Sequence, residues 1–335
     1  MKTRHAGLLV VVCLALIGKP LNAQESTVYA TVVATKLFVV GAANPRTGLF
    51  FQRPADDTVW HHAGPVNIRA FGTSVPPSAR GKVLYIAAGN GLHKSTDGGA
   101  TWRITTDWRI TEVLGVSPDP TDMNTVYVAT PYGVFRTTDG CATWAEANAG
   151  LGALFTSCVL VDRSDSRKVY CATEDGVYRS DDRGLHWKRF GLSVGGARVV
   201  VQHPRDPLTL IVGTEDHGLY VTRNGGKWWT KSEAGVDHST FYAVAFDPNS
   251  PDTVYAGGYV TGVYKSVDGA RSWKRMNAGL TVLTIHSLAV DPAKSERVYA
   301  AAYWGGVFRS DNGGAIWRNV GHPDSQVYTI VVEPF

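Results

Sequence analysis

KSTDGGATW, residues 94–102, recurs along the chain with small changes. Five further copies and one degenerate copy are RTTDGCATW (136–144), RSDDRGLHW (179–187), VTRNGGKWW (221–229), KSVDGARSW (265–273), RSDNGGAIW (309–317) and FQRPADDTVW (51–60). The seven closing tryptophans are 42, 42, 43, 42, 44 and 44 residues apart. A fixed period of this length indicates one supersecondary unit that is stacked many times.

Each unit contains short apolar runs separated by turn residues. In the unit at 242–273 the runs are YAVAF before Asp247-Pro248, TVYAGG, GVYKS and a fourth that begins at Ser272. Runs rich in Val, Tyr, Thr and Phe between Gly, Pro, Asn and Asp are typical of strands joined by tight turns. Four strands in about 40–45 residues make one propeller blade. The sequence therefore predicts an all-β fold, a seven-bladed β-propeller of four-stranded antiparallel blades.

The chain contains seven candidate innermost strands, at 67–75, 110–118, 154–162, 197–204, 240–248, 284–292 and 326–334. No strands follow the last one, so its partners are expected near the N-terminus, as KLFVVGA (36–42), GLFFQ (48–52) and the segment around Trp60. The C-terminal strand would then join the N-terminal strands and close the ring, which removes free sheet edges. The segment TVYATVV (27–33) is not needed to complete the four strands of this last blade. It would compete for the position of the innermost strand or lie along the ring.

Residues 1–23 are predicted to be a secretory signal peptide. Lys2 and Arg4 precede an apolar run at 6–18, and a polar stretch closes on Ala23, where cleavage is expected. The run is shorter than the ~20 apolar residues of a spanning helix. Residues 24–335 would then form a single propeller domain, secreted or periplasmic, with no integral membrane segment after cleavage. Lipid attachment at Cys13 is disfavoured because three valines precede it.

Charge and cysteine content argue against a nucleic-acid-binding protein and against a scaffold held by disulfides. Removal of the signal leaves 30 basic against 29 acidic residues, so no basic stripe argues for a nucleic-acid partner. The remaining cysteines, Cys141, Cys158 and Cys171, are too few for a disulfide framework. Cys158 and Cys171 fall in the first and second strands of one blade, so a cross-strand disulfide between them stays open.

The phrase Ser-x-Asp-x-Gly-x-x-Trp resembles the Asp-box, or BNR repeat, over essentially the whole chain after residue 23. The chain is similar to propellers related to the photosystem II stability and assembly factor, and to sortilin-type propellers. This resemblance implies that the repeated turn joins the third and fourth strands at the outer rim. Asn224 replaces the Asp of one copy, and Cys141 and Ala270 replace the Gly of two others.

The repeated turn is predicted to be structural. Its Asp and Ser accept hydrogen bonds from backbone donors, its Gly tolerates a positive φ, and its Trp buries apolar area. A turn needed in every blade cannot be one catalytic site, and the turns lack the alternating oxygen ligands of a calcium loop, so no metal or other cofactor is expected. The structural set is Ser95, Asp97, Gly99, Trp102, Asp139, Trp144, Asp182, Gly184, Trp187, Trp229, Asp268, Trp273 and Trp317.

Catalytic motifs have little support in the sequence. GLSVG (191–195) matches a nucleophile elbow but falls in a loop between two blades rather than between a strand and a helix. Sialidases resemble six-bladed rings with a Phe/Tyr-Arg-Ile-Pro tetrapeptide that is absent here, and Arg69, Arg109 and Arg198 are equally explained by surface ion pairs. Xyloglucan hydrolases resemble a pair of Asp-box rings, one ring more than this chain provides.

The loops that the repeat does not fix are the candidate binding face. Those joining second to third strands, and one blade to the next, lie on one face of a propeller. They carry Trp108, Arg109, Tyr132, Asp175, Asp216, His217, Tyr242, Tyr259, Tyr303 and Trp304. Aromatic and acidic side chains around a channel mouth suit a protein loop or a sugar. The alternative is that the acids are turn residues and the aromatics are strand ends.

These observations favour an exported, non-catalytic propeller that binds a protein partner in an assembly or interaction role. The alternative is a carbohydrate-binding or glycoside hydrolase-like propeller. A glycoside hydrolase needs two carboxylates roughly 5 to 9.5 Å apart. Glu174 and Glu215, at equivalent positions in adjacent blades, are the evident pair.

Overall fold

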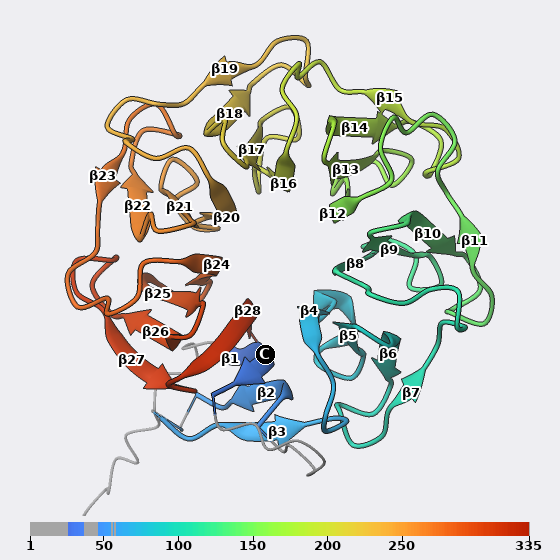
Figure 1. Cartoon of the computed structure of the whole chain (residues 1–335), viewed down its shortest axis with the longest axis horizontal. Helices are drawn as coiled ribbons and strands as arrows, with labels where there is room; N and C mark the ends of the chain where they lie inside the picture. Colours follow the sequence, from blue (N-terminus) through green and yellow to red (C-terminus); the bar gives the residue numbers. More distant parts are fainter. Residues whose placement is uncertain (1–25, 37–45, 55, 57, 335) are drawn as a thin grey trace, which may run out of the picture.

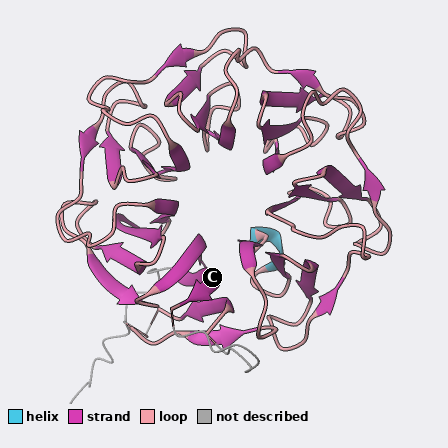
Figure 2. Ribbon diagram, in the orientation of Figure 1, coloured by secondary structure: helices cyan, strands magenta, loops and turns pink. Residues whose placement is uncertain are grey.

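The computed structural model describes residues 26–36, 46–54, 56 and 58–334, and the predicted signal peptide lies outside this part. Seven four-stranded antiparallel sheets form a ring (Figure 1), which confirms the predicted seven-bladed all-β propeller. Strands and loops make up almost all of the described chain (Figure 2), with one 3₁₀ turn, η1 (Pro77–Ala79). The described part of the chain contains no helix with the length and apolar character that a membrane crossing requires.

The blades are numbered here by the order of their inner strands. Blade 1 holds β4 (Ala70–Ser74), β5 (Leu84–Ala88), β6 (Gly91–Ser95) and β7 (Arg103–Ile104). Blade 2 holds β8 (Gly115–Pro118), β9 (Val126–Thr130), β10 (Gly133–Thr137) and β11 (Ala145–Glu146). Blade 3 holds β12 (Thr156–Val161), β13 (Val169–Thr173), β14 (Gly176–Ser180) and β15 (Lys188–Arg189).

The remaining blades repeat this order. Blade 4 holds β16 (Ala197–Gln202), β17 (Leu210–Thr214), β18 (Leu219–Thr222) and β19 (Thr230–Lys231). Blade 5 holds β20 (Phe241–Phe246), β21 (Val254–Gly258), β22 (Val263–Ser266) and β23 (Lys274–Arg275). Blade 6 holds β24 (Ile285–Asp291), β25 (Lys294–Ala302), β26 (Gly306–Ser310) and β27 (Arg318–Gly321). Blade 7 holds β28 (Ser325–Pro334), β1 (Ser26–Thr35), β2 (Gly48–Gln52) and β3 (His61–Ala63).

Blade 7 closes the ring with strands from both ends of the chain (Figure 1). The C-terminal β28 pairs with β1, from Ser26 opposite Pro334 to Thr35 opposite Ser325. Assigning the second strand of this blade to KLFVVGA was therefore wrong, and residues 37–42 of that segment lie outside the described part. The segment 27–33 forms this strand instead, because it is β-branched and buried on both faces, as a strand between two others requires.

Antiparallel order gives the ring two distinct faces. The lower face carries the turns between first and second strands and between third and fourth strands, and the upper face carries the other loops. On the lower face, four buried aspartates at the ends of inner strands accept hydrogen bonds from the following blade: Asp119 from Ser166 (2.8 Å), Asp162 from Gln202 (2.8 Å), Asp247 from Ser295 (3.0 Å) and Asp291 from Ser26 (2.6 Å). The last of these bonds ties blade 6 to the closing blade.

The Asp-box turns of blades 1 to 6 are held by hydrogen bonds inside the turn. In blade 1, Gly99 N donates to Ser95 Oγ (2.8 Å) and Thr101 N donates to Asp97 Oδ1 (2.9 Å). These two bonds require two successive residues in the left-handed region, Gly98 (φ 74°) and Gly99 (φ 92°). The same geometry holds at Cys141 (φ 76°) and Ala270 (φ 64°), where the second of the two left-handed positions is kept without glycine.

The Asp-box tryptophans connect neighbouring blades. Trp187 is 3% exposed, and its Nε1 donates to the Ala147 carbonyl of the preceding blade (2.7 Å). Corresponding bonds to the preceding blade run from Trp60 to Val320, Trp144 to Thr105, Trp229 to Phe190, Trp273 to Ser232 and Trp317 to Met276. Trp102 differs, because its Nε1 donates to Gly99 within its own turn. The repeated turn thus joins blades as well as strands.

The structure contradicts a disulfide between Cys158 and Cys171. All three described cysteines are free thiols. Cys158 lies opposite Ala172, while Cys171 lies opposite Val159, so the two side chains point to opposite faces of the sheet. Cys171 packs towards blade 2 beside Tyr127, whereas Cys158 packs towards blade 4.

Candidate binding site at the upper channel mouth

The inner strands share an irregularity near their upper ends. In six blades a β-bulge leaves one residue of the inner strand without a partner on the second strand. A bulge re-aims the side chain at that position. The bulged residues are Phe71, Ser157, Arg198, Tyr242, His286 and Tyr328, and Leu114 holds the equivalent place in blade 2, five residues before Asp119.

All seven of these side chains line one hollow, which we call the upper mouth. Its volume is about 290 Å³, and Phe155 and Glu215 complete its lining. One residue from each blade therefore reaches the same place, although the residues are spread over more than 250 positions of the sequence. Below the upper mouth, the channel continues between the inner strands, lined by Ser287, Thr329 and Gly72 among others.

Aromatic rings form a continuous arc over half of the upper mouth. The ring of His286 stacks on Tyr242, with centroids 5.3 Å apart and planes at 10°, and on Tyr328, at 4.4 Å and 16°. Tyr328 in turn meets the edge of Phe71 at 5.8 Å. This arc spans blades 5, 6, 7 and 1, so it presents a rigid aromatic wall.

The aromatic arc carries no charge at neutral pH. Burial lowers the pKa of His286 from 6.5 to about 4, so its imidazole is neutral. Burial also raises the pKa of the Tyr242 and Tyr328 phenols. The wall is therefore suited to apolar or planar groups rather than to ions.

The charge in the upper mouth is confined to blade 4. Arg198 Nε donates to Glu215 Oε2 at 2.8 Å, and a second guanidinium nitrogen contacts the same oxygen. The Arg198 guanidinium also lies 5.4 Å from the centroid of the Phe155 ring. An ion pair on one side and rings on the other make the upper mouth asymmetric.

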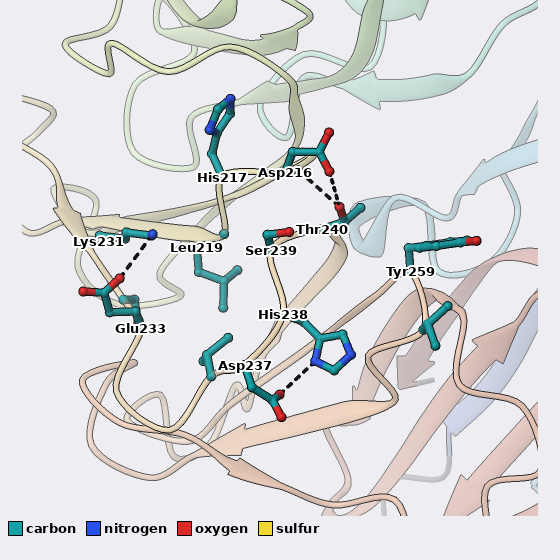
Figure 3. Close-up of a pocket in the computed structure, with 14 residues that line it drawn as sticks. Asp216, His217, Leu219, Lys231, Glu233, Asp237, His238, Ser239, Thr240 and Tyr259 are labelled. Atoms are coloured by element: carbon teal, nitrogen blue, oxygen red, sulfur yellow. Dashed lines mark hydrogen bonds and ion pairs between the residues drawn. The ribbon is translucent and has the colours of Figure 1, made fainter.

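A second hollow, which we call the side pocket, lies between blades 4 and 5 on the same face (Figure 3). Its volume is about 560 Å³. Apolar side chains of Leu219 and Val236 line it together with Asp216, His217 and Tyr259. The two hollows are neighbours, because Glu215 lines the upper mouth and the next residue, Asp216, lines the side pocket.

Most of the charges around the side pocket are paired. Lys231 forms an ion pair with Glu233 (3.2 Å), as Figure 3 shows, and Arg275 pairs with Asp237. Asp237 also accepts hydrogen bonds from Tyr264 and His238, and these contacts lower its pKa. Among the residues that the structure describes, no group of three or more His, Cys, Asp or Glu side chains could hold a metal ion.

The sequence-predicted face residues fall into three groups. Tyr242 lines the upper mouth, and Tyr303 lies beside it, 5.5 Å from the His286 ring and 5.8 Å from Trp304. Asp216, His217 and Tyr259 line the side pocket.

The third group lies outside the linings of both hollows. Trp108 and Tyr132 are 85% and 55% exposed on the upper loops of blades 1 and 2. Arg109 is paired with Asp107 at 2.6 Å. Asp175 accepts a hydrogen bond from Tyr178 (2.6 Å) and pairs with Arg189, so its carboxylate is used within blade 3.

The two candidate catalytic carboxylates are not brought together in the upper mouth. Glu215 lines it in an ion pair with Arg198, whereas Glu174 is exposed and is not among its lining residues. Sequence reasoning also missed Phe155 and most of the ring itself: Phe71, Leu114, Ser157, His286 and Tyr328. The ring residues share one signal, the position five residues before the Asp-Pro turn or its equivalent, which differs in residue type from blade to blade.

Comparison with known proteins gives one partial family match. Residues 133–260 match the family model described as sortilin, neurotensin receptor 3, and no curated protein matches the sequence. The matched span lies within the ring and contains three of the seven repeated turns, so it agrees with the observed fold. The chain is a seven-bladed β-propeller.

Solved structures similar to this propeller include enzymes and a peptide complex. The Niastella koreensis GH74 enzyme is 17% identical with a TM-score of 0.67, covering 89% of this chain and 55% of that one. An ancestral GH74 enzyme is 20% identical with a TM-score of 0.63, covering 79% and 38%. YCF48 bound to D1 peptide is 18% identical with a TM-score of 0.59, covering 76% and 83%. Identities this low show a shared fold alone.

Proposed function

We propose that this propeller is an exported, non-catalytic protein that captures a polypeptide segment of a protein partner at its upper mouth. One observation carries the proposal: a repeat that keeps its rim turns nearly constant directs a different set of side chains, one per blade, into one hollow. A single asymmetric ligand requires an asymmetric ring. Export is inferred from the signal-like sequence at 1–23.

The size of the upper mouth suits a side chain rather than a whole ligand. Its 290 Å³ lies at the lower limit of typical ligand pockets, about 300–1,000 Å³. A bulky apolar or aromatic side chain of the partner would fill it against Tyr242 and His286. The rest of the segment would lie on the surrounding loops, where Tyr303 and Trp304 supply aromatic contact area.

The comparison with YCF48 supports a polypeptide ligand. That protein has been solved with a bound D1 peptide, and this chain spans 83% of its length. By contrast, this chain spans only 38% and 55% of the two GH74 enzymes. This chain therefore covers a larger share of the peptide-bound protein than of either enzyme.

Selection from a phage-displayed library of random peptides tests the proposal. The wild-type protein should enrich peptides that carry a large apolar or aromatic residue, and the Tyr242→Ala/His286→Ala variant should lose this enrichment. Trp228→Ala is the matched control, because Trp228 is an exposed aromatic (66%) on the lower face. Absence of enrichment by the wild type, or equal enrichment by the double variant, would contradict the proposal.

A carbohydrate ligand is the second candidate, favoured by the stacked aromatic wall, since aromatic rings also pack against sugar rings. A glycan array and an assay for released sugar separate the two candidates. Glycan release that Glu215→Gln abolishes would favour a hydrolase. Glycan binding without release would favour a lectin-like role.

A further inference from the structure

We propose that the side pocket binds a lysine or arginine side chain of the same polypeptide whose apolar side chain enters the upper mouth. This inference rests on the proposed function and specifies the partner's chemistry. Two side chains of the ligand would then be recognised: an apolar one in the upper mouth and a basic one in the side pocket.

Around the side pocket, one carboxylate of the described residues has no cationic partner. The cations Lys231, Arg275 and Arg198 each have an acidic partner, in Glu233, Asp237 and Glu215 respectively. Asp216 is exposed, and within the described part of the chain its carboxylate accepts a hydrogen bond only from Thr240 Oγ (3.2 Å), with no ion pair. Figure 3 shows this carboxylate at the edge of the pocket, directed at Thr240. The pocket therefore has an unneutralised negative charge that a cationic side chain would satisfy.

The lining of the pocket suits the shape of a long basic side chain. Val236 is partly exposed in the pocket and Leu219 is fully buried beneath it, so the Val236 side chain can pack against a methylene stem. Tyr259 is 60% exposed, and its backbone N–H donates to the carbonyl of Thr240 (3.2 Å), so its loop is fixed to the residue that contacts Asp216. An exposed phenol ring near a carboxylate is a favourable surrounding for an ammonium or guanidinium group.

The two hollows lie close enough for one segment to reach both. Glu215 and Asp216 are consecutive, and Thr240 of the side pocket is two residues from Tyr242 of the upper mouth. Two residues of extended chain span roughly 6.6–7 Å. A ligand should therefore carry its apolar and basic residues about two to four positions apart.

The inference is tested by sequencing the peptides that the wild type and Asp216→Asn select from the same random library. Asn tolerates the left-handed backbone at this position (φ 68°), so the substitution removes charge without a change of shape. The wild-type pool should contain Lys or Arg two to four positions from the apolar residue, and the Asp216→Asn pool should lose only the basic residue. Asp107→Asn, a paired acid on the same face, is the control.

Affinities of one selected peptide give a second readout. Asp216→Asn should weaken binding of the Lys-containing peptide about five- to tenfold, and should change binding of its Lys→norleucine analogue less than about twofold. Apolar enrichment without basic enrichment in the wild-type pool, or an equal loss for both peptides, would overturn the basic pocket while the proposed function stands. Absence of any enrichment would overturn both.

Discussion

The imidazole of His286 lies parallel to the phenol ring of Tyr328, with centroids 4.4 Å apart and planes at 16°. Its other side faces Tyr242 of blade 5 in the same manner. Three side chains that are more than 40 residues apart in sequence therefore form one stack, because each occupies the bulge of its inner strand. The stack keeps His286 half-buried and neutral, and this has a consequence that can be measured.

Acid should weaken the fold through His286. Its pKa is lowered from 6.5 to about 4, so the unfolded chain binds a proton at this residue before the folded chain does. The free energy of unfolding should fall as the pH drops from 6.5 towards 4, by at most about 3 kcal/mol from this residue. His286→Phe, measured by urea unfolding at pH 7 and pH 4.5, should lose less stability on acidification than the wild type. His322, with a pKa of about 4 as well, contributes equally to both proteins. Equal losses would exclude this role for His286.

Trp187→Ala should destabilise the fold by about 3–5 kcal/mol. The indole is 3% exposed and donates to the preceding blade, so its removal leaves a cavity and an unpaired carbonyl at a blade junction. Trp228→Ala should change the free energy of unfolding by less than about 0.5 kcal/mol, because Trp228 is 66% exposed. Chemical denaturation of both variants checks this contrast, which similar losses would refute.

Arg183→Gly should stabilise the protein by roughly 0.5–1 kcal/mol. Arg183 occupies an Asp-box turn with φ at 61°, and its carbonyl accepts hydrogen bonds from Tyr127 (2.9 Å) and Arg136 (2.7 Å), so its backbone is fixed in the left-handed region. Arg183→Ala keeps the Cβ and serves as the control, with little gain expected. A glycine variant no more stable than the alanine variant would argue against this source of strain.

Deletion of residues 326–335 should lower the melting temperature sharply. These residues form nearly all of β28, whose loss would expose the edge of β1 and remove Val327 and Ile330 from the junction between blades 6 and 7. Circular dichroism on heating is the measurement. An unchanged melting curve would contradict closure of the ring by this strand.

Periodicity made the fold predictable, because the number of blades, the inner strands and the C-terminal closure all follow from the spacing of the repeat. The second strand of blade 7 was misassigned, since no Asp-box precedes TVYATVV to set its register. A disulfide from Cys158 to Cys171 could not be judged from spacing either. It depends on which sheet face each side chain takes, and the bulge at Ser157 alters that register.

The candidate site was only partly predictable. Tyr242, Asp216 and Tyr259 were accessible to sequence reasoning because they lie in loops that vary between blades. His286 and Tyr328 were not, because they lie within strands and read as ordinary strand residues. Their role depends on the bulge, which is a property of pairing between two strands, and their residue types do not reveal it; only their shared position, five residues before the Asp-Pro turn or its equivalent, marks them in the sequence.

The central claim, that the ring of bulged side chains is the binding surface, is tested most directly by one equilibrium measurement. This is the dissociation constant of a library-selected peptide for the wild type, Tyr242→Ala/His286→Ala and Trp228→Ala. If the aromatic stack supplies the main anchor, the double variant should bind at least about 100-fold more weakly, whereas Trp228→Ala should bind as the wild type does. A double variant that remains folded and binds within about twofold of the wild type would contradict the claim.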